Sequence, residues 1–230
     1  MPVSFSLMSE VSRRQYDATR RREQAAGTRR RIIDAAARLF VERGYAGTTI
    51  PAIAAEAGVA VETVYRSASG KAGLLADAVH AAVAGGTERA EVPVRERPAI
   101  RRIDEEPDPA RQLQLYAATQ PGIWSRVGPL LRVLDAAANG DASLVDLRDR
   151  LAAERRHGLR DGFGRMLAGR GVLREGMTAE RAGDIVYAVC GRANYEALVG
   201  DCGWSEAEYE AWLAETLVAA LLPPTMHPTT

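Results

Sequence analysis

Residues 48–75, TTIPAIAAEAGVAVETVYRSASGKAGLL, decide the fold of the N-terminal part of this chain. The stretch predicts two short helices joined by a sharp turn. Thr49 can cap the first helix, Pro51 suits its first turn, and Gly58 can end it. A glycine at that corner also supplies the backbone angles that a tight turn between helices requires. The spacing is that of a helix-turn-helix motif at about residues 49–68.

The second helix of this motif has an inner and an outer face. Val64, with Ile53 and Val59, would fill the crossing between the two helices. In a DNA reader, the first residues of such a helix enter the major groove. The residues left to point outward are Val61, Glu62, Thr63, Tyr65 and Arg66. An unrelated helical hairpin would show the same spacing, so the motif alone leaves that alternative open.

The outward residues carry groups that suit nucleic acid. Arg66 and Lys71 can bond phosphates or guanine, while Thr63 and Tyr65 offer hydroxyls to phosphates. Glu62 is unexpected, since an acid near phosphates is unfavourable. It would have to accept from a cytosine amino group or pair with Arg66, four residues on.

Composition places the chain among ordinary helical globular proteins. It has 230 residues, of which 47% are hydrophobic, so it makes one large domain or two modest ones. No apolar run approaches 18 residues and the first residues lack a secretory pattern, so we expect a cytoplasmic protein without a membrane partner. Cys190 and Cys202 are too few for a disulfide scaffold, and with three scattered histidines they predict no metal site.

The net charge of zero hides an asymmetry along the chain. Residues 1–31 hold eight arginines against three acidic residues, and residues 1–90 hold 13 basic against 9 acidic groups. The remainder holds 17 basic against 21 acidic groups. Basic charge concentrated at the front is expected if only that part faces phosphates, although a solvated tail would look the same.

Apolar spacing follows a period of 3.6 almost throughout, which predicts an all-α chain. A proline-rich, charged stretch at residues 91–109 is typical of a linker, and we expect a short helix in it around Ile100. Ser205 and Glu208 form a capping box for the last helix, with Trp204 and Tyr209 placed as its hydrophobic staple. Beyond the linker, helices are expected at residues 110–138 (interrupted near Pro121 and Pro129), 142–168, 179–199 and 206–222.

Residues 26–86 resemble the DNA-binding domain of the TetR family of one-component regulators. The resemblance is carried by the helix ending at Phe40, then GYAGTT, IAAEAGV, the Val64-Tyr65 pair and Lys71 before LL. It implies an N-terminal three-helix DNA-binding head with a fourth helix leading into a helical C-terminal domain. The expected divisions are an Arg-rich arm at 1–25, the DNA-binding domain at 26–90, the linker at 91–109, and a ligand-binding and dimerisation domain at 110–225.

The resemblance also implies roles for particular residues. Thr49, Tyr65 and Lys71 would contact phosphates, and Ala60 to Thr63 would meet bases. The C-terminal segments GRGVLREGMTAERAGDIVYAV and LVGDCGWSEAEYEAWLAETLVAALLP look like the helices that pair with a second subunit in one branch of the family. The length of the segment before the first helix, about 25 residues, differs from the family pattern, and its arginines suggest that this arm enters the minor groove beside the recognition helix.

Two positions depart from the family pattern. Ala68 stands where an aromatic residue is usual, so neighbouring side chains must repack. Ala60 replaces a frequent serine and so removes a side-chain cap from the recognition helix. These changes favour a rival hypothesis, in which the chain is a helical ligand- or partner-binding protein whose head no longer reads DNA.

A helical body joined to a DNA-binding head predicts a sensor of a small molecule. The candidate pocket residues are Tyr116, Gln120, Trp124, Arg132, His157, Phe163, Met166, Tyr187 and Asn194. Each has a simpler explanation: Tyr116 and Met166 at helical spacing suit a core, His157 suits the surface, and Asn194 suits a dimer interface. No effector is identified by these residues.

No catalytic motif is found, so we expect no enzyme and no cofactor. The sequence lacks a Gly-x-Ser-x-Gly elbow, a His-Glu-x-x-His pair and a phosphate-cradling glycine loop after a strand. The function expected from the sequence is a homodimeric transcriptional regulator. It would repress from a near-palindromic operator and be released by a small-molecule effector.

Overall fold

A computed structural model of the protein describes the backbone of residues 4–224 and the side chains of residues 20–224. All regular structure in these residues is helical, which confirms the all-α prediction. The chain divides into two compact units, Met1–Ala78 and Val79–Thr230. The first unit contains α1 (Ser4–Gly47), α2 (Ile50–Ala57), α3 (Val61–Ser67) and the start of α4 (Gly70–Ala84).

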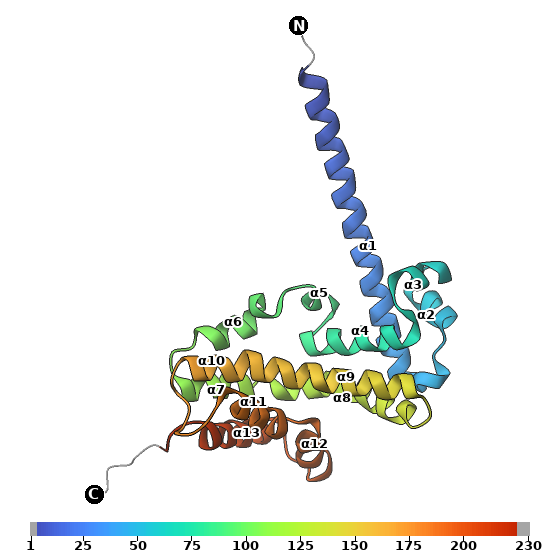
Figure 1. The fold of residues 1–230 in the computed structure, drawn as a ribbon. Coiled ribbons are helices and arrows are strands. Elements are labelled where there is room, and N and C mark those ends of the chain that lie inside the picture. The colour runs from blue at the N-terminus through green and yellow to red at the C-terminus, as the bar shows by residue number, and fades with distance from the viewer. Residues whose placement is uncertain (1–3, 225–230) are drawn as a thin grey trace, which may run out of the picture. The chain divides into compact units, whose positions relative to one another are not determined.

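The first unit is built on the C-terminal half of α1, beside which α2 and α3 lie (Figure 1). Buried apolar side chains hold these helices together: Ile32, Phe40, Ile53, Val64 and Leu74 are all less than 2% exposed. The alternation of these residues with polar ones at helical spacing is what placed them on inner faces. The inward position expected for Val64 and Ile53 is therefore the position observed.

The corner between α1 and α2 is fixed by a buried hydroxyl. Gly44 takes a non-helical conformation with φ 70°, which interrupts α1 near its end. Thr48 is fully buried, and its Oγ1 donates to the carbonyl oxygens of Leu39 at 3.0 Å and Gly44 at 2.8 Å. The hydroxyl thus covers carbonyls that the ending helix leaves without a partner.

The start of α1 differs from the expectation. The sequence predicted a first helix beginning after about residue 25, preceded by an arm, whereas the helix begins at Ser4 and is 44 residues long. Residues 20–25 are exposed along this helix. Few of the residues in this stretch break a helix, and arginine, glutamate and alanine all favour one.

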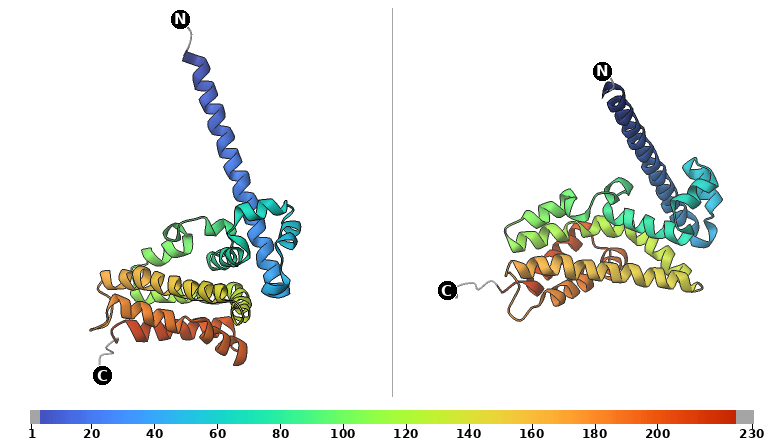
Figure 2. Two further views of the ribbon diagram at one scale, coloured as in Figure 1. Left: turned by 45° about the vertical axis from the view of Figure 1, so that its right-hand side comes forward. Right: turned by 45° about the horizontal axis from the view of Figure 1, so that its top comes forward.

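The second unit is a bundle in which α8 and α9 run side by side in both views of Figure 2. Two of its segments, η2 and η3, are π-helical. Its elements are α5 (Thr87–Ala90), η1 (Val94–Glu96), α6 (Pro98–Glu105), α7 (Pro109–Ala117), α8 (Gln120–Ala138), α9 (Ala142–Gly158), η2 (Leu159–Gly164), α10 (Arg165–Gly169), α11 (Ala179–Val189), α12 (Arg192–Tyr195), η3 (Glu196–Asp201) and α13 (Glu206–Leu221).

Two boundaries in this unit differ from the expected ones. Residues 91–109 do contain the short helix expected around Ile100, which is α6, and its buried Ile103 anchors it to the bundle. The helix expected at 110–138 is interrupted near Pro121 as predicted, between α7 and α8, but α8 passes through Pro129 without a break. The helix expected at 179–199 breaks at Cys190 and Gly191, where Gly191 adopts an extended conformation.

The start of α13 is as expected. Ser205 Oγ accepts from the backbone N–H of Glu208 at 3.2 Å, and the Glu208 carboxylate accepts from the Ser205 N–H at 2.8 Å. This is the predicted capping box. The hydrogen bonds from Ser205 hold the pKa of the Glu208 carboxyl below its usual range. The ring of Trp204 meets Trp212 edge-on, at a centroid distance of 6.4 Å.

Two glycines allow η2 and α11 to touch backbone to backbone. A Cβ on Gly164 would lie 2.2 Å from the carbonyl oxygen of Ala179, and one on Gly183 would lie 2.6 Å from the Cα of Arg160. Beside this crossing, Arg160 and Asp184 form a two-pronged ion pair at 2.6 and 2.7 Å. Contact with Arg160 lowers the pKa of the Asp184 carboxyl.

Candidate functional site

The turn between α2 and α3 has the predicted geometry. Thr49 is exposed, and its Oγ1 accepts from the backbone N–H of Ala52 at 3.2 Å, which caps α2. Gly58 ends α2 in the left-handed conformation, with φ 65° and ψ 43°. Its N–H donates to carbonyls of the preceding turn, as does the N–H of Val59, at 3.0 Å to Ala54. The direction in which α3 leaves the turn is therefore set by the backbone.

The outer face of α3 is open to solvent. Tyr65 is 62% exposed, and Glu62 and Arg66 are also exposed. Val61 and Thr63 are half-buried at its start. All five residues that the sequence placed on the outer face thus retain accessible surface, while Val64 is buried.

Ala60 and Ala68 bound this helix as the sequence suggested. Ala60 stands at the N-cap position, and no side-chain hydrogen bond caps α3 there. Ala68 follows α3 in an extended conformation and is half-buried. The hydroxyl of Ser67 donates to the carbonyl of Thr63 at 2.7 Å, which supports the last turn of this short helix.

Glu62 and Arg66 do not pair with each other within the part of the chain that the structure describes. Arg66 instead approaches Thr63 Oγ1 with its Nη2 at 3.5 Å, at the outer limit of a hydrogen bond. The guanidinium is therefore available to a partner outside the protein.

Lys71 has an internal role that the sequence did not suggest. Its Nζ donates to the carbonyl oxygens of Tyr45 at 2.9 Å and Thr48 at 3.1 Å. It also lies 4.2 Å from the centre of the Tyr45 ring, a cation–π contact. Two of the three ammonium protons thus fasten the start of α4 to the corner after α1, and the third makes no hydrogen bond among the described residues.

Arg29 is a second residue that sequence reasoning missed. Its Nη1 donates to the carbonyl oxygen of Ser67, and its Nη2 pairs with Asp77 at 2.9 Å. It therefore links α1, the end of α3 and α4. In the sequence, Arg29 was only one of many arginines in a basic stretch, so nothing distinguished it.

In the second unit, two of the candidate pocket residues, Trp124 and Tyr187, lie beside Arg155, and four others make contacts of their own. The guanidinium of Arg155 lies 5.3 Å from the centre of the Trp124 ring and 4.6 Å from that of Tyr187. Tyr116 stacks on Phe163 at 4.5 Å. Gln120 is buried and donates to Thr119 Oγ1 at 2.9 Å. Met166 Sδ accepts from the amide of buried Gln112 at 3.5 Å.

Three other candidates lie apart from this group. The side chain of His157 is 79% exposed and contacts Asp161 at 2.7 Å, so its position is that of a surface residue. Asn194 Nδ2 donates to the carbonyls of Ala188 and Val189 at 3.0 and 2.8 Å, which covers the end of α11. Arg132 is exposed and pairs with Glu196 at 2.8 Å.

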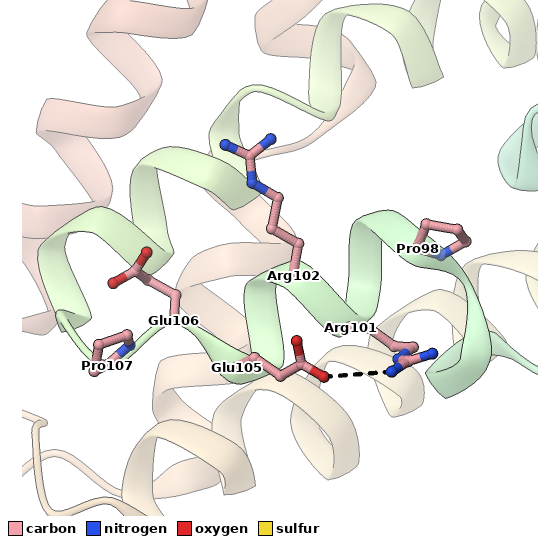
Figure 3. A pocket seen from close by; sticks show the side chains of 6 residues that line it. All are labelled: Pro98, Arg101, Arg102, Glu105, Glu106 and Pro107. Carbon is pink, nitrogen blue, oxygen red and sulfur yellow. Dashed lines mark ion pairs between the residues drawn. The ribbon is translucent and has the colours of Figure 1, made fainter.

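An open hollow lies along α6 and is lined by none of the candidates. Its residues are Pro98, Arg101, Arg102, Glu105, Glu106 and Pro107. Figure 3 shows Arg101 joined to Glu105 while Arg102 points away from that pair. The exposed, mixed charges of this hollow resemble a solvated helix face more than a ligand site.

The described residues contain no group of three side chains suited to a metal ion. No helix in the described part of the chain is long and apolar enough to cross a membrane. The organised features are thus the exposed face of α3 in the first unit and the aromatic centre around Arg155 in the second.

A helix-turn-helix with an exposed second helix, followed by a helical bundle, is an architecture that occurs among DNA-binding proteins. Residues 32–78 match the sequence model described as bacterial regulatory proteins, tetR family. The N-terminal domain therefore belongs to the TetR family, and the chain as a whole has the fold of TetR-family regulators. The resemblance noted in the sequence is confirmed.

Solved structures with this fold include three from different bacteria. A protein from Mesorhizobium loti MAFF303099, assigned to the TetR family of transcriptional regulators, is 22% identical to this chain, with a TM-score of 0.61. The match covers 86% of this chain and 98% of the other. NalD of Pseudomonas aeruginosa, the secondary repressor of the MexAB-OprM multidrug efflux pump, is 22% identical with a TM-score of 0.59, and the match covers 85% of this chain and 96% of NalD. FadR of Bacillus subtilis, in complex with stearoyl-CoA, is 19% identical with a TM-score of 0.61, and the match covers 82% of this chain and 97% of FadR. No curated protein matches the sequence.

Proposed function

We propose that the protein is a homodimeric transcriptional repressor that leaves its operator when a small molecule binds the second unit. The exposed outer face of α3, set by the Thr49 cap and the Gly58 turn, carries this proposal. NalD, whose fold this chain shares, is a repressor, and FadR with the same fold holds stearoyl-CoA. These likenesses support the proposed role.

On DNA, the start of α3 would meet base edges and its flanks would hold phosphates. Val61, Glu62 and Thr63 stand in the first turn, where a recognition helix enters the major groove. Thr49, Tyr65 and Lys71 flank it as phosphate contacts, with Ala60 allowing close approach of the backbone. Two copies held in a dimer would read a near-palindromic site. Exposed arginines at residues 20 and 22 would add attraction to the flanking phosphates.

The second unit supplies a candidate dimer surface near its end. Trp204 and Trp212 contact each other and both retain partial exposure, as do Val218 and Leu198. Apolar side chains that a monomer leaves partly in water suit contact with a second copy. The segment agrees with the helices that the sequence resemblance assigns to dimerisation.

In the rival proposal, the protein binds a ligand or a partner, and its DNA-binding head no longer recognises a specific DNA sequence. The missing side-chain cap at Ala60 favours it, because an uncapped helix of seven residues loses about 1 kcal/mol. A head without specific reading would bind all DNA sequences equally. Comparison of two duplexes of different sequence therefore separates the two proposals.

Substitutions on α3 test the proposed DNA contacts. Tyr65→Ala and Arg66→Met are expected to weaken binding to all sequences by about tenfold, because phosphate contacts carry no sequence information. Glu62→Gln is expected to change which sequence is preferred. Fluorescence anisotropy with labelled duplexes at several salt concentrations measures both effects. The matched control is Glu56→Gln, on the exposed side of α2, which should leave affinity within twofold. If all four variants showed the same change in affinity and the same sequence preference, the proposed division between phosphate-contacting and base-contacting residues would be contradicted.

A further inference from the structure

The centre of the second unit is organised around one guanidinium. Arg155 comes from α9, and the aromatic rings beside it come from α8 and α11, as Trp124 and Tyr187. Its Nη2 donates at 2.9 Å to the carbonyl of Cys190, a buried residue of the core to which Tyr209 of α13 also belongs. Elements far apart in the sequence thus converge on Arg155.

The charge of Arg155 has no counter-ion among the side chains of residues 20–224. Its Nη1 and Nη2 donate to the carbonyls of Tyr187 at 3.0 Å and Cys190 at 2.9 Å. Among the residues whose side chains are described, no carboxylate lies within ion-pair distance of it. A half-buried cation beside aromatic rings is stabilised in part by those rings, but withdrawal from water remains costly without an anion.

Two buried hydrogen-bond donors, one on the ring beside Arg155 and one on a phenol within reach of its charge, have no partner among the described residues. Trp124 Nε1 and Tyr209 Oη are both buried, and neither makes a hydrogen bond. An indole N–H can only donate, and leaving such a group unpaired costs about 1–3 kcal/mol. Burial raises the pKa of Tyr209 and of the neighbouring Tyr116, so their phenols stay protonated at neutral pH.

The unsatisfied groups of this centre therefore share one character. Arg155, Trp124 and Tyr209 offer positive charge or donors, and the surrounding surface is aromatic, including the stacked rings of Tyr116 and Phe163. A cationic ligand would be repelled here, and a purely apolar one would leave the donors unpaired. An aromatic anion satisfies both the charge and the donors.

We propose that the effector site of this protein takes an aromatic carboxylate, with its carboxylate between Arg155, Trp124 Nε1 and Tyr209 Oη and its ring among the neighbouring aromatic side chains. This inference rests on the proposed ligand response and adds the chemical class of the ligand. The carboxylate accepts from both orphaned donors and neutralises the guanidinium. The ring replaces contacts that aromatic side chains now make with one another.

The elements around this site are of a kind that can shift to admit a ligand. The π-helical segment η2 begins directly after α9, the helix that carries Arg155. Pro129 stands inside α8, the helix that carries Trp124, and removes a backbone hydrogen bond there. Both features weaken the local helical ladder, and π-segments occur frequently at functional sites.

Binding of 2-naphthoate to the full-length protein tests the inference, with 2-naphthamide as the neutral isostere. Isothermal titration calorimetry is expected to show at least tenfold tighter binding of the carboxylate than of the amide. Tyr209→Phe removes one donor and no ring, and it should weaken naphthoate at least fivefold. Arg155→Met should abolish the preference for the carboxylate. Tyr195→Phe is the matched control, because its ring packs against Tyr209 while its hydroxyl already bonds Glu206 at 2.9 Å.

Folding of the variants is checked without ligand. Tyr209→Phe deletes a hydroxyl that has no partner, so its melting temperature should equal or exceed that of the wild type. Equal affinity for acid and amide, or wild-type affinity in Tyr209→Phe, would overturn the inference. DNA binding, measured on the same preparations, distinguishes failure of the proposed ligand site from failure of the proposed regulatory function. Salt-sensitive operator binding without any response to naphthoate would refute the aromatic-anion site alone, whereas naphthoate binding without operator binding would refute the proposed regulator.

Discussion

Gly164→Ala is expected to destabilise the second unit by about 3 kcal/mol, the upper part of the range for overpacking a tight contact. The backbone of Gly164 is ordinary helix, with φ −61° and ψ −46°, so alanine adds no conformational strain. The whole effect comes from space. The new Cβ would lie 2.2 Å from the carbonyl oxygen of Ala179, and that atom belongs to backbone and cannot turn aside. The helices η2 and α11 would have to separate.

Urea unfolding followed by circular dichroism measures this loss. Gly162→Ala is the control, because it lies in the same π-helical segment and a Cβ there meets nothing within 4 Å. The control should match or slightly exceed the wild type in stability, since alanine favours a helical backbone more than glycine does. Equal urea midpoints for the two alanine variants would contradict the close backbone contact between η2 and α11.

Lys71→Met is expected to have the largest effect in the DNA-binding unit, lowering its stability by about 2 kcal/mol and operator affinity at least tenfold. The ammonium of Lys71 holds the carbonyls of Tyr45 and Thr48, and hydrogen bonds from charged groups contribute about 1.5–3 kcal/mol. Its loss would loosen the corner that places α2. Hydrogen exchange of the amides in α2 and α3 measures the loosening, and anisotropy measures the affinity.

Arg66→Met serves as the comparison for Lys71→Met. Arg66 is exposed and makes only a 3.5 Å contact with Thr63, so its loss should weaken DNA binding without changing exchange rates. The salt dependence then divides the two roles of Lys71. If its third proton meets a phosphate, the slope of log K against log salt falls by about one in Lys71→Met. Unchanged exchange in α2 and α3 would refute the structural role.

The sequence predicted the elements whose signals are local. The cap at Thr49, the turn at Gly58 and the capping box of α13 depend on residues within three or four positions of one another. The extent of α1 was missed because residues 12–31 are mostly polar and rich in arginine, a composition that is also typical of a solvated tail. The break at Cys190 was missed because Gly191 stands in an otherwise regular apolar pattern.

The candidate sites were predictable to different degrees. The exposure of Tyr65 could be predicted, because Val64 occupies the inner face of α3 and the helical period then places Tyr65 on the outer face. Arg155 could not be found from sequence, because it lies in a run of charged residues typical of a solvated face. Its position among the rings of Trp124 and Tyr187 depends on how α8, α9 and α11 pack. The internal bonds of Lys71 and Arg29 likewise join residues 20 or more positions apart.

The most direct test of the regulator hypothesis compares binding of the purified full-length protein to two duplexes of equal length. One carries the DNA upstream of its own coding sequence, and the other carries the same bases in random order. Fluorescence anisotropy is measured at roughly 50, 100 and 200 mM salt, a range over which phosphate contacts strongly affect affinity. We expect at least about a hundredfold preference for the upstream duplex, and an affinity that falls as the salt concentration rises. Equal affinity for the two duplexes, or none for either, would contradict it.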